Sequence, residues 1–290
     1  MKSLDVLRFH LLEAAAADHS SCFRKKEIIM TNNIYEGYDL RGTILRLERS
    51  SIYDGDGYRT VIFMKGCPLR CQWCSTPESQ NYQIEEAEGK QYGKIMTVEE
   101  VLREVRKDIP FYFHSGGGMT ISGGELLSQS EYVRCLLERA RWEAIDTAIE
   151  TSLYGDWERA EPILRASNTV FVDLKLTDDE EHRKYCGVSN KRILENLKRA
   201  GTMQADYKLI VRTPLIPGIN DSEAELVRIG QFCAQLPNLH FFQLLPYHRL
   251  GSDTYRKLGR PYLLKDLRAP SAEHMERCRD IIGRYVKAVI

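Results

Sequence analysis

Three cysteines lie within eight residues and have the spacing of metal ligands. Cys67, Cys71 and Cys74 form the pattern C-x-x-x-C-x-x-C directly after a run of β-branched and apolar residues at 60–66. Soft thiolate ligands select zinc or iron–sulfur clusters. Three thiolates on a short loop can bind three corners of a cubane cluster and leave the fourth iron open for a substrate. The spacing therefore predicts a metal centre at this loop.

A structural zinc site of three cysteines and one histidine is the alternative for these residues. Zinc sites commonly use paired C-x-x-C ligands, and no second pair accompanies the triplet. The remaining cysteines are isolated in the sequence, which favours buried apolar roles over metal binding. They are Cys22, Cys135, Cys186, Cys233 and Cys278.

A glycine pair marks a second candidate site. Gly123, Gly124 and Glu125 directly follow the β-branched run at 119–122. Glycine lets a backbone approach a ligand closely. A phosphate-binding loop is a poor alternative, because no Gly-Lys-Ser/Thr sequence follows. Two glycines alone are weak evidence, so their position after a strand and downstream of the cysteines carries the prediction.

The elements that position these residues alternate regularly from residue 42 onward. Runs of strand character are followed by stretches of helical periodicity, which predicts an α/β fold with a parallel sheet, either a barrel or a doubly wound sheet. Strands are expected at 43–48, 60–66, 119–122, 146–151, 169–175, 208–213 and 240–245. Helices are expected at 97–108, 128–142, 156–166, 191–200, 222–236 and 271–288.

Polar side chains occur where most of these strands end, and this is the edge where α/β folds collect their functional groups. Thr97 and Glu100 form a capping-box pattern at one helix start, and Ser271 is the expected N-cap of the last helix. The polar residues at strand ends include Cys67, Glu125, Glu150, Thr151, Asp173, Lys175, Arg212 and His248.

Composition excludes several classes of protein. The chain has 290 residues, 43% of them hydrophobic and 28% charged, which is unlike a disordered, collagenous or coiled-coil protein. Its 41 basic and 41 acidic residues give a net charge of zero. No overall field attracts a nucleic acid or an anionic membrane, and we expect neither as a partner. No apolar run approaches the roughly 20 residues of a membrane-spanning helix.

The N-terminal segment differs from the rest of the chain. We expect residues 1–40 to form a flexible extension and residues 41–290 to form the catalytic domain. Asp5 and Arg8 interrupt any apolar core of a signal peptide. Cysteines without an export signal favour a reducing compartment, so a cytoplasmic location is expected. Met30 is a second candidate for the start of the native protein.

These motifs together resemble the radical S-adenosylmethionine (radical SAM) superfamily. The cysteine triplet has an aromatic residue, Trp73, before its third cysteine, and the Gly-Gly-Glu motif follows. Over residues 42–287 the chain is similar to the glycyl-radical-enzyme activating enzymes, including the pyruvate formate-lyase activating enzyme. The resemblance implies a partial (β/α)6, TIM-like barrel. It rests on DGDGYRTVIFMKGCPLRCQWC, HSGGGMTISGGE, VDLKLTDDEEHRKYCGVSN, VRTPLIPGIN and LLPYHRLG.

The resemblance implies a cofactor set and a reaction. Cys67, Cys71 and Cys74 would hold a [4Fe-4S] cluster whose open iron binds S-adenosylmethionine. One electron would cleave the S–C5′ bond, and the 5′-deoxyadenosyl radical would take a hydrogen from a glycine of a partner, a glycyl-radical enzyme such as pyruvate formate-lyase. A flavodoxin or ferredoxin would supply the electron. Cysteine is absent from 75–122, so we expect no additional clusters.

The resemblance also implies roles for individual residues. Lys175, Arg212 and His248 are the expected catalytic residues, and Glu125 would accept hydrogen bonds from the methionine amino group. For Trp73, exclusion of water is the alternative to a contact with adenine. Ion pairs of purely structural function are the alternatives for Asp173 with Lys175 and for Arg212. The expected cofactor contacts are Trp73, Gly123, Gly124, Glu125, Glu150, Thr151, Asp173, Lys175 and His248.

Two positions depart from the family pattern. Glu150 stands where the family has aspartate in an Asp-Thr pair that, with Asp173, holds a monovalent cation beside the S-adenosylmethionine carboxylate. The additional methylene puts that cation site in question. Asp56 replaces the proline of a DGPG motif, and we expect the substitution to loosen this loop.

The target of the enzyme stays open at this stage. Pyruvate formate-lyase and other glycyl-radical lyases or dehydratases are all compatible with the motifs. A radical SAM enzyme acting on a small molecule is one alternative function. A non-catalytic iron–sulfur or zinc protein is another.

Overall fold

The structure is a computed structural model that describes residues 37–290. Residues Leu40–Ile290 form one compact unit. The predicted N-terminal extension, the candidate start at Met30 and Cys22 lie outside the described residues, apart from the last few positions of the extension. All of the predicted site residues lie within the described part.

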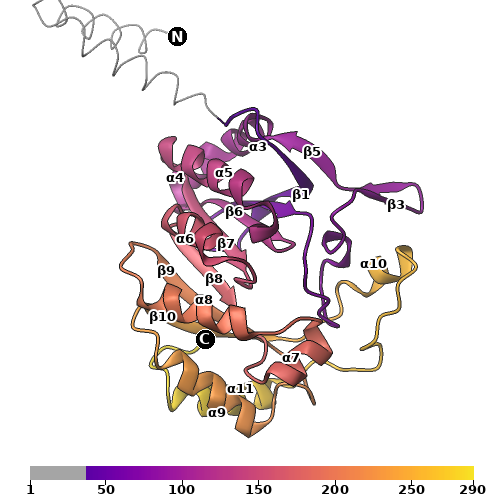
Figure 1. Cartoon of the computed structure of the whole chain (residues 1–290), viewed down its shortest axis with the longest axis vertical. Helices are drawn as coiled ribbons and strands as arrows, with labels where there is room; N and C mark the ends of the chain where they lie inside the picture. Colours follow the sequence, from indigo (N-terminus) through magenta and orange to yellow (C-terminus); the bar gives the residue numbers. More distant parts are fainter. Residues whose placement is uncertain (1–36) are drawn as a thin grey trace, which may run out of the picture. The chain divides into compact units, whose positions relative to one another are not determined.

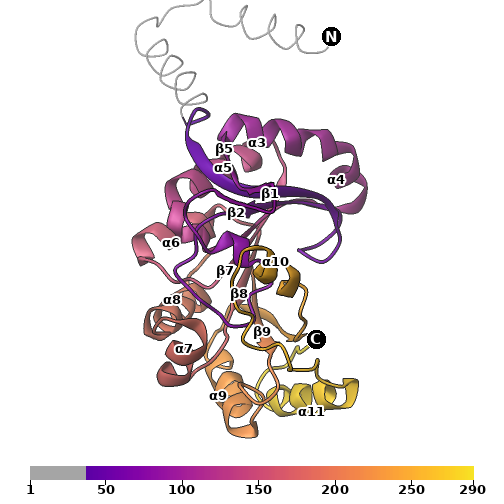
Figure 2. The same ribbon diagram turned by 90° about the vertical axis from the view of Figure 1, so that its right-hand side faces the viewer.

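One eight-stranded sheet runs through the described chain, with strand order β10-β9-β8-β7-β6-β2-β1-β5. Six consecutive strands of this order, from β2 to β10, are parallel, whereas β1 is antiparallel to both β2 and β5. The sheet stays open, ending at β10 and β5. The six parallel strands are β2 (Arg59–Met64), β6 (Gly118–Gly123), β7 (Asp146–Thr151), β8 (Thr169–Asp173), β9 (Lys208–Leu215) and β10 (Leu239–Pro246). This arrangement confirms the predicted α/β class and the partial barrel (Figures 1 and 2).

The long strand β1, three short antiparallel strands and three 3₁₀ turns complete the N-terminal half of the described chain. A separate β3–β4 hairpin follows the cysteine loop. These elements are β1 (Arg41–Ser51), β3 (Glu85–Ala87), β4 (Lys90–Tyr92), β5 (Lys94–Thr97), η1 (Pro77–Ser79), η2 (Arg106–Asp108) and η3 (Leu126–Gln129).

Helices follow the parallel strands and pack in the same order as the strands. Helix α5 contacts α3 and α6, α6 contacts α8, and α9 packs against α11 (Figure 1). Their bounds are α3 (Val98–Val105), α4 (Ile109–Ser115), α5 (Ser130–Trp142), α6 (Trp157–Arg165), α7 (Asp179–Cys186), α8 (Lys191–Thr202), α9 (Glu223–Cys233), α10 (Ser252–Lys257) and α11 (Ala272–Gly283).

The predicted helix caps are present. Thr97 Oγ1 accepts a hydrogen bond from Glu100 N, and Glu100 Oε2 accepts one from Thr97 N, so the capping box is complete. Ser271 Oγ accepts from His274 N at the start of α11. The helix predicted at 97–108 is shorter than expected, because α3 ends at Val105 and a 3₁₀ turn leads into α4.

The helical periodicity of the sequence did not predict three of the helices in the described part of the chain, α4, α7 and α10. Helix α4 carries Pro110 in its first turn and exposes three of its apolar side chains, so it lacks a regular buried stripe. Helix α7 is mostly charged, with only two buried residues. Helix α10 is six residues long. None of these segments shows the apolar spacing on which the sequence prediction depends.

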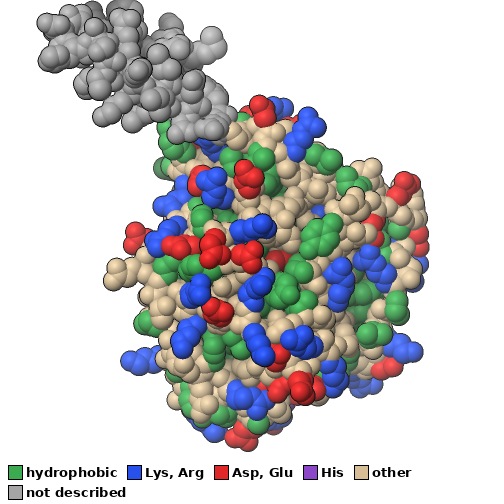
Figure 3. Space-filling view, in the orientation of Figure 1, with side chains coloured by type: hydrophobic (Ala, Val, Ile, Leu, Met, Phe, Trp, Pro, Cys, Tyr) green, Lys and Arg blue, Asp and Glu red, His purple; other side chains and the backbone are tan. Residues whose placement is uncertain are grey.

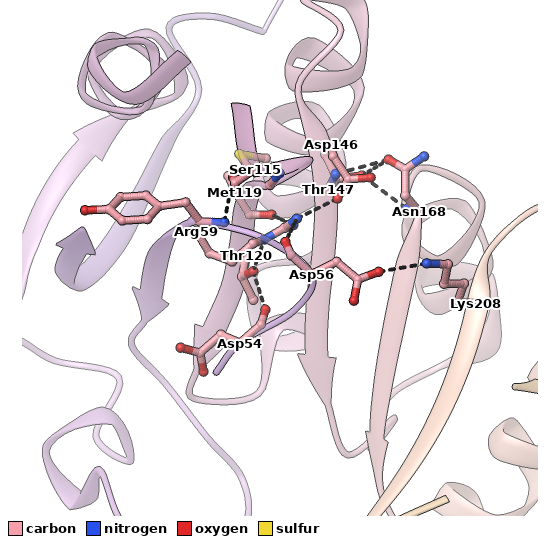
Figure 4. A network of polar contacts seen from close by, with 12 residues as sticks. Asp54, Asp56, Arg59, Ser115, Met119, Thr120, Asp146, Thr147, Asn168 and Lys208 are labelled. Atoms are coloured by element: carbon pink, nitrogen blue, oxygen red, sulfur yellow. Dashed lines mark hydrogen bonds and ion pairs between the residues drawn. The ribbon is translucent and has the colours of Figure 1, made fainter. Parts of the chain in front are cut away.

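A buried arginine ties together the amino-terminal ends of the parallel strands (Figure 4). The guanidinium of Arg59 donates to Thr120 Oγ1 (3.0 Å), to Asp146 Oδ1 (2.6 Å) and to the carbonyl oxygen of Asp56 (3.3 Å). The side chain of Asp56 forms an ion pair with Lys208 at the start of β9 (2.7 Å). The loop that contains Asp56 is therefore contacted at both its backbone and its side chain, while the expected loosening stays a prediction.

Candidate active site

The cysteine loop connects β2 to the rest of the sheet and is held by the end of α7. Residues on both sides of Cys71 donate backbone hydrogen bonds to that helix end, Arg70 N to Cys186 O (2.7 Å) and Gln72 N to Tyr185 O (3.0 Å). These two contacts place the sulfur-bearing residues Cys71 and Cys186 in one buried apolar cluster. The conformation of the loop is thus fixed by a helix far away in the sequence.

The three thiols of the triplet are largely desolvated. A hydrogen bond with the Cys186 thiol, followed by burial, raises the pKa of the Cys71 thiol. Burial raises the pKa of Cys74 to about 11 and also raises the pKa of Cys67. Thiols with raised pKa values stay protonated at neutral pH without a metal, so metal binding at this loop would release protons.

The donor set fits a cubane cluster better than a zinc ion. Within residues 37–290, no group of three or more His, Cys, Asp or Glu side chains is arranged to hold a single metal ion. In a cubane the three cysteines bind three different iron atoms, so their sulfurs need not meet at one point. Three soft thiols without disulfide partners fit that requirement.

The Gly-Gly-Glu motif joins the end of β6 to the start of the cysteine loop. Gly124 N donates to Met64 O and Glu125 N donates to Gly66 O, both at 3.0 Å. A Cβ atom on Gly124 would lie 2.4 Å from Gly66 O, and Gly123 has φ +102° with equally close contacts to the backbone of Met64. The glycines therefore permit a close approach to the backbone at the end of β2 and the start of the cysteine loop, while the predicted approach to a ligand stays a prediction.

The carboxylate of Glu125 is buried and holds the end of β7. Its Oε1 accepts from Thr151 Oγ1 (2.6 Å) and Leu127 N (3.2 Å). Its Oε2 accepts from Ser152 N (2.9 Å) and from the Ser152 hydroxyl. A carboxylate has about four acceptor positions, and four donors surround this one. The carboxylate thus joins β6 to β7, and the predicted contact with an amino group would require one of these donors to yield.

A chain of alternating charges crosses the carboxyl ends of β7, β8 and β9. Arg212 Nη1 lies 2.6 Å from Glu150 Oε1, and Arg212 Nε lies 3.2 Å from Asp173 Oδ1. Lys175 Nζ lies 2.8 Å from the other oxygen of Asp173. Asp173 and Arg212 are direct partners in the β8–β9 register, which explains why they meet. The sequence predicted these four residues individually, and the sheet brings them together.

The charges of this chain reach the cysteine loop. Burial lowers the pKa of the Lys175 ammonium, but Asp173 and the nearby Cys71 outweigh burial and raise it overall. Burial opposes the charge of Asp173 as well, and Lys175 and Arg212 hold the pKa of this carboxyl below its usual value. Lys175 and Asp173 are therefore both ionised at neutral pH near the thiol of Cys71.

Two predicted residues lie apart from this charged chain. Trp73 is 7% exposed and packs in the apolar cluster of Cys71, Cys186 and Tyr247. This position matches the water-excluding role, while the contact with adenine stays a prediction. His248 is exposed, and its ring accepts from Leu250 N (3.4 Å). Gly251, three residues after His248, lies against the carbonyl oxygen of Cys74. The loop that carries His248 therefore lies beside the cysteine loop.

Sequence reasoning missed three residues of the site. Ser152 donates to Glu125, Ser122 Oγ donates to Glu150 Oε2 (2.6 Å), and the Cys186 thiol contacts Cys71. The two serines could have been found from their places at the ends of β6 and β7. Cys186 lies in the segment VDLKLTDDEEHRKYCGVSN, but its proximity to Cys71 could not be predicted, because it depends on the packing of α7.

Comparison with known proteins agrees with this geometry. Residues 61–229 match the Radical SAM superfamily. The chain belongs to this superfamily. Within this radical SAM family, it is 38% identical to the isethionate sulfite-lyase activating enzyme of Oleidesulfovibrio alaskensis over 279 aligned residues, covering 78% of this chain and 90% of the relative. It is 32% identical to the pyruvate formate-lyase-activating enzyme of Clostridium pasteurianum over 249 residues, covering 86% and 98%.

A solved structure supports the same relationship. A domain of pyruvate-formate lyase-activating enzyme from Bacteroides vulgatus is 30% identical, with a TM-score of 0.50, and covers 60% of this chain and 98% of that domain. SuiB of Streptococcus suis, with a TM-score of 0.56 and 20% identity over 79% of this chain and 48% of its own, shares the fold. These relatives identify this radical SAM protein as a glycyl-radical-enzyme activating enzyme, with a [4Fe-4S] cluster and S-adenosylmethionine as cofactors.

The surface and helices of this radical SAM enzyme add two observations. On the face drawn in Figure 3, Lys and Arg side chains are interspersed with Asp and Glu side chains. Among the described helices, none combines the length and apolar character needed to cross a bilayer.

Proposed function

We propose that this enzyme installs a glycyl radical in a partner lyase or dehydratase, with Cys67, Cys71 and Cys74 as the ligands of its cluster. The observation that supports the proposal is the backbone contact between the Gly-Gly-Glu motif and the start of the cysteine loop. The hydrogen bond from Glu125 N to Gly66 O fixes the two motifs beside each other. Motifs with the cluster ligands and the cosubstrate contacts must be neighbours for the reaction to occur.

A [4Fe-4S] cluster held by Cys67, Cys71 and Cys74 would supply the one electron needed for cleavage of S-adenosylmethionine to methionine and a 5′-deoxyadenosyl radical. The residues of the chain position the reactants. Lys175 presents a cation after the end of β8, suited to the oxygens of the cosubstrate, and Arg212 holds the Glu150 and Asp173 carboxylates in place beside it. Trp73 and its apolar neighbours exclude water from the cysteine loop. Keeping water and stray donors out is essential, because a carbon radical takes the first accessible hydrogen.

The relatives define the kind of partner. Their names include pyruvate formate-lyase, isethionate sulfite-lyase and (2S)-3-sulfopropanediol dehydratase activating enzymes. We propose a partner of the same kind, a large glycyl-radical lyase or dehydratase. We further propose that residues 41–290 are the catalytic domain, that the electron donor is a flavodoxin or ferredoxin, and that the enzyme acts in the cytoplasm, where thiols stay reduced.

The lengths of the alignments bear on additional clusters. The alignment with the isethionate sulfite-lyase activating enzyme spans 279 positions but includes only 78% of this chain. Some residues of that relative therefore have no counterpart in this chain. The Clostridium pasteurianum relative aligns over 249 positions that include 86% of this chain. The segment 75–122 contains no cysteine. We therefore propose that the enzyme holds a single cluster. Its sequence identity is nevertheless higher to the isethionate relative, whose alignment contains more gaps in this chain, than to the Clostridium pasteurianum relative.

Anaerobic reconstitution tests this function. The full chain is loaded with iron and sulfide, reduced with dithionite and given S-adenosylmethionine, and 5′-deoxyadenosine is measured by chromatography. The proposal predicts product from the wild type and none from a Cys71→Ala variant. A chain that binds iron but yields no 5′-deoxyadenosine would be a non-catalytic metal protein.

A further inference from the structure

A guanidinium occupies the position between two carboxylates where the family resemblance predicts a monovalent cation. Arg212 reaches Glu150 at 2.6 Å and Asp173 at 3.2 Å, with one nitrogen toward each. A potassium or sodium ion in this position would be coordinated by the same carboxylate oxygens. The arginine and the ion therefore compete for one place.

Arg212 is held firmly in this place. Its side chain is only 11% exposed, and its guanidinium carbon lies 4.8 Å from the centre of the Phe171 ring. A cation over an aromatic face is further stabilised by the ring quadrupole. Burial opposes the charge of Arg212, but Glu150 and Asp173 outweigh burial and raise its pKa, so it stays protonated.

The oxygen atoms that an ion would need already have partners. Glu150 Oε2 accepts from Ser122, and Asp173 Oδ2 accepts from Lys175. The Thr151 hydroxyl donates to Glu125 and accepts from Leu153 N. Each expected ligand of the ion is thus engaged in a protein hydrogen bond. An ion placed between Glu150 and Asp173 would have to displace the Arg212 guanidinium, so the donor set as it is arranged does not fit a monovalent cation.

The charges in this group also balance without an ion. Glu150 and Asp173 contribute two negative charges, and Lys175 and Arg212 contribute two positive charges. The additional methylene of Glu150, compared with aspartate, lets its carboxylate reach the guanidinium.

We propose that Arg212 is a built-in cation that replaces the monovalent ion, so that this enzyme binds and cleaves S-adenosylmethionine without potassium or sodium. Arg212 acts as a positioning residue that holds Glu150 and Asp173 at fixed places beside the cosubstrate. The inference rests on the proposed function, because it concerns the same site.

The first test uses the reconstituted wild-type enzyme. Binding of S-adenosylmethionine is measured by anaerobic equilibrium dialysis in potassium, sodium and choline chloride at equal ionic strength. The dissociation constant should differ by less than about twofold among the salts. The line width of the sodium-23 nuclear magnetic resonance signal is measured in the presence of the enzyme. It should not change when S-adenosylmethionine or potassium is added. A larger, saturable dependence of binding on one cation, or a stoichiometric sodium site, would overturn the inference.

The second test removes the guanidinium. In Arg212→Gln, S-adenosylmethionine binding in choline chloride should weaken by at least about tenfold, and potassium should restore part of it. Arg192→Gln, which removes an exposed arginine paired with Asp156, is the matched control and should bind equally in all salts. A folded Arg212→Gln protein that binds equally in every salt, or that no cation restores, contradicts the replacement. If this variant does not fold by circular dichroism, the wild-type salt series decides.

The two failures are distinguishable. If the proposed function is wrong, 5′-deoxyadenosine is absent in every salt. If only the inference is wrong, 5′-deoxyadenosine forms in potassium or sodium and is lost in choline.

Discussion

Thr151 Oγ1 donates a hydrogen bond of 2.6 Å to Oε1 of Glu125, and this contact joins the carboxyl ends of β6 and β7. Glu125 belongs to the Gly-Gly-Glu motif, whose backbone N–H groups also donate to Met64 O at the end of β2 and to Gly66 O before the cysteine loop. One side chain therefore links the cluster loop, β6 and β7. The site depends on this residue for its shape as well as for any contact with the cosubstrate.

Glu125→Gln should destabilise the protein. The amide keeps the size of the carboxylate but replaces one acceptor oxygen with a donor, which leaves two buried donors facing an NH2 group. We expect a loss of about 1–3 kcal/mol in the free energy of unfolding, measured by anaerobic denaturant titration. Glu131→Gln, at an exposed position of α5, is the control and should change this value by less than about 0.5 kcal/mol. Equal effects of the two substitutions would contradict the structural role of Glu125.

Arg59 and Lys208 lie in the same network at the amino-terminal ends of the strands, but they should differ greatly in their contribution (Figure 4). Arg59 is 1% exposed, and its removal leaves two buried acceptors, Thr120 Oγ1 and the Met119 carbonyl oxygen, without their donor. Arg59→Met should cost about 3–5 kcal/mol of unfolding free energy. Lys208 is half exposed, and Lys208→Met should cost less than about 1 kcal/mol. Thermal unfolding of both variants measures the difference, and comparable losses would show that the burial of Arg59 is misassigned.

Asp54 should make stability depend on pH. Burial, followed by the charge of Glu150, raises the pKa of its carboxyl, while Ser51 and Arg212 lower it. The folded protein thus keeps the proton to a higher pH than the unfolded chain. The unfolding free energy should therefore fall as pH rises from the unfolded-state pKa, about 3.9, through the raised folded-state pKa.

Asp54→Asn should remove this part of the pH dependence, because the amide does not titrate. Denaturant titrations at a series of pH values between 4 and 7 measure the effect. Asp206→Asn, at an exposed turn, is the control and should leave the wild-type slope in place. An unchanged slope in Asp54→Asn would mean that other groups cause the dependence.

Cys186→Ala should keep a full cluster. The thiol of Cys186 contacts Cys71, but the three cysteines of the loop account for the three ligands. Iron and sulfide analysis after anaerobic reconstitution should give the wild-type content for Cys186→Ala and a large loss for Cys71→Ala. Loss of iron in Cys186→Ala, with an intact fold by circular dichroism, would make Cys186 a fourth ligand.

The sequence predicted the elements whose patterns are local. The strand expected at 146–151 coincides with β7, because its alternation and its flanking residues are contained in that segment. Helix α7 could not be predicted in the same way, since its residues are mostly charged and only His182 and Cys186 are buried. Its N-cap Asp178 and C-cap Gly187 are local features, but its attachment to the domain depends on His182 and Cys186, which is a tertiary effect.

The site followed the same division. The spacing of the cysteines and the position of the Gly-Gly-Glu motif after β6 were sufficient to predict both motifs. The pairing of Arg212 with Glu150 was not predictable, because it depends on the register of β7, β8 and β9 and on the length of the glutamate side chain. The sequence raised the question about a cation at Glu150, and we propose that the Arg212 guanidinium takes its place.

The origin of the hydrogen atom in 5′-deoxyadenosine tests the central claim most directly. A candidate glycyl-radical partner is produced with glycine that is doubly deuterated at its α-carbon, and it is mixed anaerobically with the reconstituted enzyme, S-adenosylmethionine and dithionite. The account predicts singly deuterated 5′-deoxyadenosine by mass spectrometry and a glycyl-radical signal in the partner by electron paramagnetic resonance. Undeuterated product without a radical in any glycyl-radical lyase or dehydratase encoded beside this chain would contradict it.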